Sequence, residues 1–376
     1  MENVSHTLAG FVLARGGLEK TTPLAATALV VGANLPDVDL AWSSFKSALV
    51  YFHYHRGWTH SLPGAAVLTV LLWAVLLGVD RWVPARRSKS GARTRPLPLL
   101  AAAAMGVGSH LLMDAANSYG VRPLLHWSDR WMYGDLWVIV DPWLWLFLGG
   151  AVYLSGSGGR RRDRVWLMGA AVAACVVLFT PVVPAACRIA WAAALLTALA
   201  VCRGAAGRHG DGSRAARAGL ALVVLYAALC AVSHHAALGR LGQRGAERAG
   251  GHAPTVAALP RPADPFRWEG IIADASTLRH GTVVALPFVD GTAATMATLP
   301  RGLDDPAAAR LLTSCAGEVI REFFRFPFAT LEEDPGGGRV VVVRDARYTR
   351  EGRGFAAYAA VLDRSGEPIV DRRECP

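Results

Sequence analysis

Charged residues are scarce in this sequence. Asp, Glu, Lys and Arg make up 18% of its 376 residues, whereas hydrophobic residues make up 53%, and the mean hydropathy is +0.30. This composition argues against a single soluble domain, because it carries more apolar surface than one soluble core of this size needs. We therefore predict a membrane protein.

The sequence also has few cysteines and no recognisable secretion signal. Four of its six cysteines lie in apolar stretches and act as small hydrophobic side chains: Cys175, Cys187, Cys202 and Cys230. Cys315 and Cys375 lie in the polar C-terminal part, where the sequence leaves open whether they form a disulfide. The N-terminus lacks a basic region and a cleavage site, since Glu2 and His6 interrupt it, so we expect it to stay on the mature protein.

Six apolar stretches approach the roughly 20 residues that a helix needs to cross the bilayer. They cover residues 62–80, 97–117, 137–155, 165–182, 184–202 and 218–236. Two apolar arms precede them, at 5–18 and 23–42, and their sequence predicts a helical hairpin that is re-entrant or spans a thinned bilayer. The expected fold is thus an all-α polytopic membrane domain over residues 1–238, with a hairpin and about six transmembrane helices.

The net charge of +10 comes from short basic runs between the apolar stretches. These runs lie in the loops at 81–96, 156–164 and 203–217, and the positive-inside rule places such loops in the cytoplasm. The same alternation places residues 240–376 outside the cytoplasm. Because the basic residues act as a topology signal, we expect membrane lipids as partners and no nucleic acid.

The C-terminal part has a different composition. A Gly-, Arg- and Pro-rich linker is expected over residues 239–265, followed by a small extracytoplasmic α+β domain over 266–376. Its strand-like runs are Thr282–Phe288, Arg339–Val343 and Phe355–Leu362, and an amphipathic helix is expected near 305–325. Nothing in this part of the sequence indicates a particular protein partner.

His110 and Asp114 lie four residues apart in an otherwise apolar stretch. At that spacing both side chains face the same side of a helix, so one imidazole and one carboxylate can reach a single metal ion. Ionisable groups inside a membrane-spanning stretch are costly and usually functional. The alternative is an ion pair or hydrogen-bonded pair that orients packed helices.

Other His and Asp residues lie at the ends of the apolar stretches that are expected to face outward. They are His6, Asp37, Asp39, His55, His60, Asp135 and Asp141. Taken singly, Asp37 and Asp39 are explained equally well as an interfacial turn or helix cap, and His60 as a solvated interfacial group. However, the charge rule uses only Arg and Lys and still places all of them near one membrane face. Three or more such ligands suit zinc, or alternatively manganese, with a metal-bound water as nucleophile.

Several of these residues occur in motifs that resemble a known family. The motifs are the early His6, Leu35-Pro-Asp37-Val-Asp39, His55-Arg-Gly-Trp-Thr-His60-Ser61, and His110-x-x-x-Asp114 followed by Asn117-Ser-Tyr-Gly120. Over about residues 1–155 they resemble the bacterial YdjM-like family of membrane-bound metal-dependent hydrolases, also described as LexA-binding inner-membrane proteins. The resemblance implies an inner-membrane location and a metal site formed by His6, Asp37, His60, His110 and Asp114. It implies Asp39, His55 and Asp141 as further candidates.

The His-x-x-x-Asp element also looks like that of zinc-dependent phospholipases C and single-strand nucleases, which implies a phosphodiester or phospholipid substrate. We therefore expect a metal-dependent hydrolase in which Asp39, His55 and Arg56 are the catalytic candidates. Arg56 would clamp a phosphate, or would simply anchor its loop at the interface. Two other classes stay open: a membrane protein with a structural metal site, and an ion-coupled transporter.

Overall fold

The computed structural model describes most of the chain. The described residues are 1–82, 93–156, 159–205, 212–246, 254–285, 296–334, 337–349 and 354–376. Much of the expected cytoplasmic loops at 81–96 and 203–217 lies outside them. The chain forms two compact units: unit 1 contains residues 1–36, 58–233 and 260–266, and unit 2 contains residues 37–57, 234–259 and 267–376.

Unit 1 is helical. Its helices are α1 (Asn3–Arg15), α2 (Ala25–Gly32), α5 (Leu62–Trp82), α6 (Pro96–Ala115), α7 (Pro142–Ser155), α8 (Arg160–Phe179), α9 (Ala185–Ala205) and part of α10 (Gly212–Ala246), with short 3-10 turns η1 (Leu18–Lys20) and η3 (Trp58–His60). Among the described residues, three helices are long and apolar enough to cross a membrane: α5, α6 and α10. α7 and residues 185–201 of α9 are shorter apolar helices. The helical membrane-type architecture is as expected, but a count of six spans is not established.

Two predicted boundaries in unit 1 are wrong. The second hairpin arm was expected to reach residue 42, yet α2 ends at Gly32 and is followed by the 3-10 turn η2 (Leu35–Asp39). Pro36 lies in that turn, where a proline cannot donate the hydrogen bond that would continue an α-helix. Likewise α7 begins at Pro142 and not at 137, because the Asp141 carboxylate accepts hydrogen bonds from the amides of the first helical turn.

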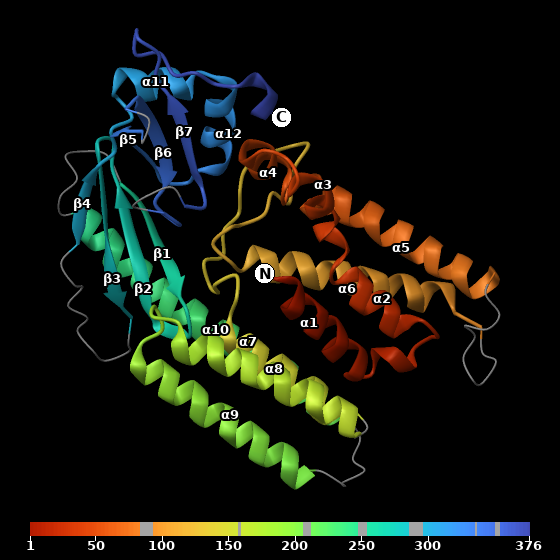
Figure 1. Ribbon diagram of the computed structural model, residues 1–376. Helices are drawn as coiled ribbons and strands as arrows, with labels where there is room; N and C mark the ends of the chain where they lie inside the picture. The colour runs from red at the N-terminus through yellow and green to blue at the C-terminus, as the bar shows by residue number, and fades with distance from the viewer. Residues whose placement is uncertain are drawn as a thin grey trace. The chain divides into compact units, whose positions relative to one another are not determined.

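Helices α1, α2, α5 and α6 lie side by side in unit 1 (Figure 1). Glycines allow the closest approaches: a Cβ added to Gly10 would lie 2.8 Å from Val30 Cα, and one added to Gly106 would lie 2.7 Å from the Leu29 carbonyl oxygen. Such small residues let helix backbones come together. The buried core here is made by Ala14, Ala25, Ala28, Leu29, Leu72, Leu76, Leu99, Ala102 and Ala103. This packing brings Gly32, at the end of α2, against Ala103, Gly106 and Val107 of α6.

Two small antiparallel sheets lie mostly in unit 2. The first has the order β1 (Thr255–Arg261), β2 (Asp264–Ala273), β3 (Thr277–Val284) and β4 (Ala297–Pro300); the second has the order β5 (Pro327–Glu333), β6 (Arg339–Asp345) and β7 (Ala357–Val361). Ile271 and Leu278 of the first sheet share a buried cluster with Phe328 of the second. The expected sheet domain is therefore present, although residues 286–288 of the predicted run at 282–288 lie outside the described part of the chain.

Two details of this part differ from the sequence expectations. The region expected to be a linker, 239–265, contains the end of α10 and the whole of β1. The helix expected near 305–325 is two helices, α11 (Pro306–Leu312) and α12 (Cys315–Phe323). Ser314 separates them, because its hydroxyl accepts a hydrogen bond from the Gly317 amide and so begins a new helix.

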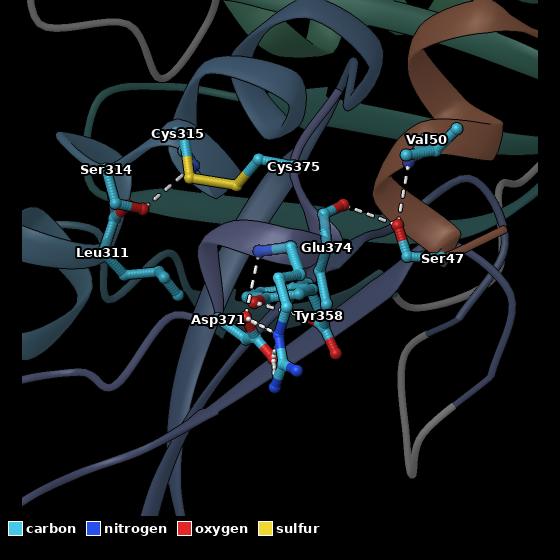
Figure 2. The surroundings of a disulfide bond; sticks show 11 residues. Ser47, Val50, Leu311, Ser314, Cys315, Tyr358, Asp371, Glu374 and Cys375 are labelled. Atoms are coloured by element: carbon cyan, nitrogen blue, oxygen red, sulfur yellow. Dashed lines mark hydrogen bonds and ion pairs between the residues drawn. A yellow bond between two sulfur atoms is a disulfide. The ribbon is translucent and has the colours of Figure 1, made fainter.

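Unit 2 also contains residues 37–57, which were expected within the membrane domain. They form α3 (Leu40–Ser43) and α4 (Ala48–Tyr54), and α4 packs against α12. A disulfide joins Cys315, the first residue of α12, to Cys375, which follows the 3-10 turn η5 (Arg372–Glu374) (Figure 2). The structure thus contains the disulfide that the sequence left open.

Candidate metal centre

Three elements of unit 1 bring imidazoles and a carboxylate together. His6 lies on α1, His60 ends η3, and His110 and Asp114 lie one turn apart near the end of α6. All four side chains are fully buried, with 0% of their surface exposed. Uncompensated burial of so many polar groups is costly, so they must satisfy one another or a bound cation.

The ligand-type atoms of this cluster point at one another. The Nε2 atoms of His60 and His110 are 3.1 Å apart. Asp114 Oδ2 lies 3.3 Å from His60 Nε2 and 3.4 Å from His110 Nε2. In a tetrahedral zinc site with bonds of about 2.0–2.1 Å, neighbouring ligand atoms are about 3.3 Å apart. The three atoms therefore have the mutual spacing of ligands to one ion, and the cluster could hold a metal ion.

His6 approaches the other oxygen of the same carboxylate. Its Nε2 lies 3.4 Å from Asp114 Oδ1, and its ring stacks on that of His110 with centroids 3.8 Å apart. The amino nitrogen of Met1 also contacts Oδ1. Asp114 therefore has His60 and His110 at one oxygen and His6 at the other, so its carboxylate lies at the centre of the cluster.

Hydrogen bonds on the far side of the imidazoles orient them. His110 Nδ1 lies 2.8 Å from the carbonyl oxygen of Ala33, which can only accept, so Nδ1 carries the proton and Nε2 keeps its lone pair for the cluster. His60 Nδ1 lies 3.0 Å from the hydroxyl oxygen of Thr59. Neither partner was predicted: Ala33 acts through its backbone, which no residue type reveals, whereas Thr59 lies within the motif at residues 55–61.

Asn117 lies in the motif that follows Asp114, and no role was predicted for it. Its Oδ1 accepts from the amides of Tyr119 at 2.8 Å and Gly120 at 3.4 Å. This fixes the amide orientation, so the Nδ2 donor faces Asp114 Oδ1 at 3.4 Å. The turn that follows α6 therefore helps to orient the central carboxylate.

A second group of possible ligands lies in unit 2. It consists of Asp37, Asp39 and His55, each of which offers one ligand atom within 4.8 Å of the others. Asp39 Oδ1 lies 3.2 Å from His55 Nδ1. Its other oxygen, Oδ2, accepts a hydrogen bond from the Arg56 amide at 3.0 Å. A carboxylate at Nδ1 fixes the orientation of the His55 ring. Asp39 therefore orients the His55 ring and the turn at Arg56.

Two Asp residues considered from the sequence belong to neither group in the described chain. Asp141 is the N-cap of α7 and also accepts a hydrogen bond from the Tyr226 hydroxyl at 3.1 Å. Asp135 is buried in the segment between α6 and α7, with a positive φ of 52°. In the structure Asp141 caps α7 and accepts a hydrogen bond from Tyr226.

Comparison with known proteins identifies the N-terminal half of the chain. Residues 1–187 match the model of the YdjM inner membrane protein family. This part of the chain belongs to the YdjM family. The uncharacterized protein YfhP of Bacillus subtilis (strain 168) is 26% identical over 169 residues, which cover 42% of this chain and 47% of that protein. The chain thus spans about half the length of this curated relative, and no solved structure matches it.

The YdjM match is longer than the motifs alone indicated. It extends from residue 1 to residue 187, within α9, and so contains every residue of both His/Asp groups. It does not reach the sheet domain. Membership of this inner membrane protein family, together with three helices of membrane-spanning length, makes the chain a membrane protein.

Proposed function

We propose that this protein is a membrane-bound, metal-dependent hydrolase. The observation that carries the proposal is the convergence of His60, His110 and Asp114 on one point, with ligand-type atoms 3.1–3.4 Å apart and fully buried. A cluster rich in imidazole favours zinc over magnesium or calcium, with manganese as the alternative. Such an ion would supply an acidified water for attack on an ester.

Asp37 is the proposed further ligand. The carbonyl of Ala33 contacts His110, and Asp37 follows only four residues later in a chain that turns tightly through η2. Consecutive Cα atoms are about 3.8 Å apart, so the covalent chain keeps Asp37 near the cluster. Asp37 together with His60, His110 and Asp114 gives a mixed nitrogen and oxygen set. His6, whose Nε2 lies 3.4 Å from Asp114 Oδ1, is the proposed additional ligand.

The proposed substrate is a phosphoester presented at the lipid interface, with membrane lipids as the partner class. Arg56 supports this, because a guanidinium can grip a phosphate through two parallel hydrogen bonds. Arg56 is 3% exposed and directly follows His55, whose Nδ1 faces the Asp39 carboxylate. Arg56 would hold the anion, and His55 would move a proton.

We place the site and the C-terminal domain on the extracytoplasmic side of the inner membrane. The distribution of Arg and Lys between loops supports this orientation. The disulfide between Cys315 and Cys375 supports it independently, because disulfides persist outside the cytoplasm and are rare inside it.

Replacement of His110 by Ala tests the proposal directly. We expect the zinc content of the purified protein to fall from about one ion per chain to near zero, with loss of hydrolysis of a generic phosphodiester and of phospholipid vesicles. The loss should exceed the roughly 10- to 100-fold that removal of a ligand's hydrogen-bond partner costs. His126→Ala, which changes an exposed loop histidine, is the matched control. Wild-type zinc content in His110→Ala would contradict the ligand assignment.

A structural metal site is the second candidate. The complete burial of His6, His60, His110 and Asp114 favours it, since a structural ion needs no open position for water. A protein that binds zinc, loses stability on chelation and hydrolyses no ester would have this function. The position of Asp114 at the end of α6 disfavours an ion-coupled transporter, whose site would lie near the middle of the bilayer.

A further inference from the structure

The sheet domain lies outside the YdjM family match, and nothing in the sequence indicated what it does. The segment from Asp37 to Gly57 nevertheless belongs to the same compact unit as residues 267–376. This segment carries Asp39, His55 and Arg56, which are the catalytic candidates. The contacts inside unit 2 therefore bear on how those side chains are held.

An aromatic contact joins α4 to the C-terminal helices. Phe52 of α4 is 3% exposed. Its ring lies nearly parallel to that of Phe323 on α12, at 6° with centroids 4.8 Å apart. Phe324 and Phe355 meet the same ring edge-on, at 5.8 Å and 5.5 Å. Buried aromatic clusters of this kind contribute strongly to an interface, both by area and by ring geometry.

Polar contacts flank Phe52 on both sides along the chain. His53 Nδ1 lies 2.8 Å from the Glu322 carboxylate. At the other end of α4, the Ser47 hydroxyl donates to the carbonyl oxygen of Glu374 at 2.5 Å and accepts from the Val50 amide at 3.2 Å. The residue that caps α4 is thus tied to the last residues of the chain.

The disulfide fixes those last residues. Cys375 follows Glu374 directly, and its bond to Cys315 anchors it at the start of α12 (Figure 2). The Tyr358 hydroxyl donates to the Glu374 carboxylate at 3.3 Å. Burial, and then the charge of Glu374, raise the pKa of Tyr358 to about 12, so this donor keeps its proton at neutral pH.

The end of α4 leads directly into the proposed substrate-binding turn. The helix ends at Tyr54, and His55 and Arg56 follow without an intervening linker. Asp39 holds this turn from its own side through His55 Nδ1 and the Arg56 amide. A helix clamped at Ser47, Phe52 and His53 therefore fixes the backbone from which both side chains project.

We propose that the C-terminal domain positions the turn that carries His55 and Arg56. It does so by packing Phe323 and Phe355 against Phe52, and the Cys315–Cys375 disulfide stabilises this packing. The functional part of this inference rests on the proposed hydrolase function. The positioning part depends only on contacts within unit 2.

Hydrogen exchange of the full-length protein in detergent micelles tests the positioning part. Phe52→Ala should speed exchange of the amides of residues 48–57 by at least about 10-fold, since truncating a buried aromatic leaves a large cavity. Phe45→Ala is the matched control, because Phe45 lies in the same segment but is 86% exposed, and it should leave exchange unchanged. Equal exchange in wild-type and Phe52→Ala protein would overturn the proposal.

Removal of the disulfide gives a second variant. Cys375→Ser, or treatment of wild-type protein with a dithiol reductant, should raise exchange in residues 48–57 in the same direction as Phe52→Ala. If removal of the disulfide leaves hydrogen exchange in residues 48–57 unchanged, the proposed role of the disulfide is refuted.

Kinetics then separate this inference from the proposed function. For a generic phosphodiester, Phe52→Ala should raise KM by about 10-fold or more with a smaller effect on kcat, while zinc content stays at the wild-type value. Zinc content that falls with Phe52→Ala would overturn a role restricted to His55 and Arg56. A wild-type protein with no hydrolytic activity would refute the proposed function, and the exchange data would still decide whether the domain holds this segment.

Discussion

Arg56 has a backbone conformation that residues other than glycine seldom adopt, with a φ of 57°. The carboxylate of Asp39 stabilises this turn by accepting a hydrogen bond from the Arg56 amide. The Gly57 amide adds a hydrogen bond to the carbonyl oxygen of Tyr54. A non-glycine residue in the left-handed region costs on the order of 1 kcal/mol. A buried arginine in this strained conformation supports a binding role for its guanidinium.

Replacement of Arg56 by Gly should separate stability from binding. We expect the thermal unfolding midpoint in detergent to stay the same or rise, because glycine relieves on the order of 1 kcal/mol of strain. KM for a phosphodiester should rise by about 10-fold or more, because a charged hydrogen-bond donor is lost. Arg56→Ala should show the same KM without the gain in stability. Wild-type KM in both variants would mean that Arg56 only anchors its loop.

The ligand residues could be predicted from the sequence better than their supports. The four-residue spacing of His110 and Asp114 predicted a shared helix face, and their closest ligand atoms are 3.4 Å apart. The Ala33 carbonyl was not predictable, because any residue offers the same group. Asp39 was a candidate through the motif at residues 35–39, but only the structure shows that its two oxygens contact residues 55 and 56.

At the scale of elements, the approach of α2 to α6 determines the distance between Ala33 and His110. A Cβ on Gly106 would lie 2.7 Å from the carbonyl oxygen of Leu29, whereas no heavy atom lies within 4 Å of one on Gly108. The two glycines are two residues apart on the same helix and face opposite environments. They therefore form a matched pair for testing the packing.

Gly106→Ala should lower the stability of the protein by roughly 1–3 kcal/mol, as overpacking does, and weaken zinc binding, since α2 must move away from His110. Gly108→Ala should be neutral or slightly stabilising. Thermal unfolding and zinc titration of the two purified variants check this. Identical behaviour of the pair would show that the close packing of α2 and α6 does not hold the site.

Element boundaries were less predictable than element types. The apolar run at 137–155 contains a real helix, yet the cap at Asp141 delays its start to Pro142. The amphipathic pattern near 305–325 is also real, but Ser314 divides it. In both cases one polar side chain competes with a periodicity that extends over many residues. Apolar periodicity predicts a helix but does not fix its ends.

At the scale of the whole molecule, the overall composition predicted a membrane protein. The change in composition along the chain predicted a helical part followed by a sheet domain. The grouping of residues 37–57 with that domain was not predictable. It depends on contacts such as Ser47 with Glu374, which are 327 residues apart in sequence. A single sequence contains no signal for which distant segments will meet.

The predicted orientation can be tested on the intact molecule. Alkaline phosphatase fused after Pro376 should be active in a bacterial host, because that enzyme requires an extracytoplasmic location to form its own disulfides. A fluorescent protein that matures only in the cytoplasm, fused at the same position, should stay dark. The reverse pattern would place the C-terminal domain, and with it the 37–57 segment, in the cytoplasm.

The contact between Ser47 and Glu374 also has a consequence for biosynthesis. Ser47 leaves the ribosome 327 residues before its partner, which at about 5–20 residues per second is an interval of roughly 15 to 65 seconds. Throughout that time the segment beside Arg56 is already made but lacks the surface on which it packs. Assembly of its final arrangement must therefore wait until nearly the whole polypeptide has been translated.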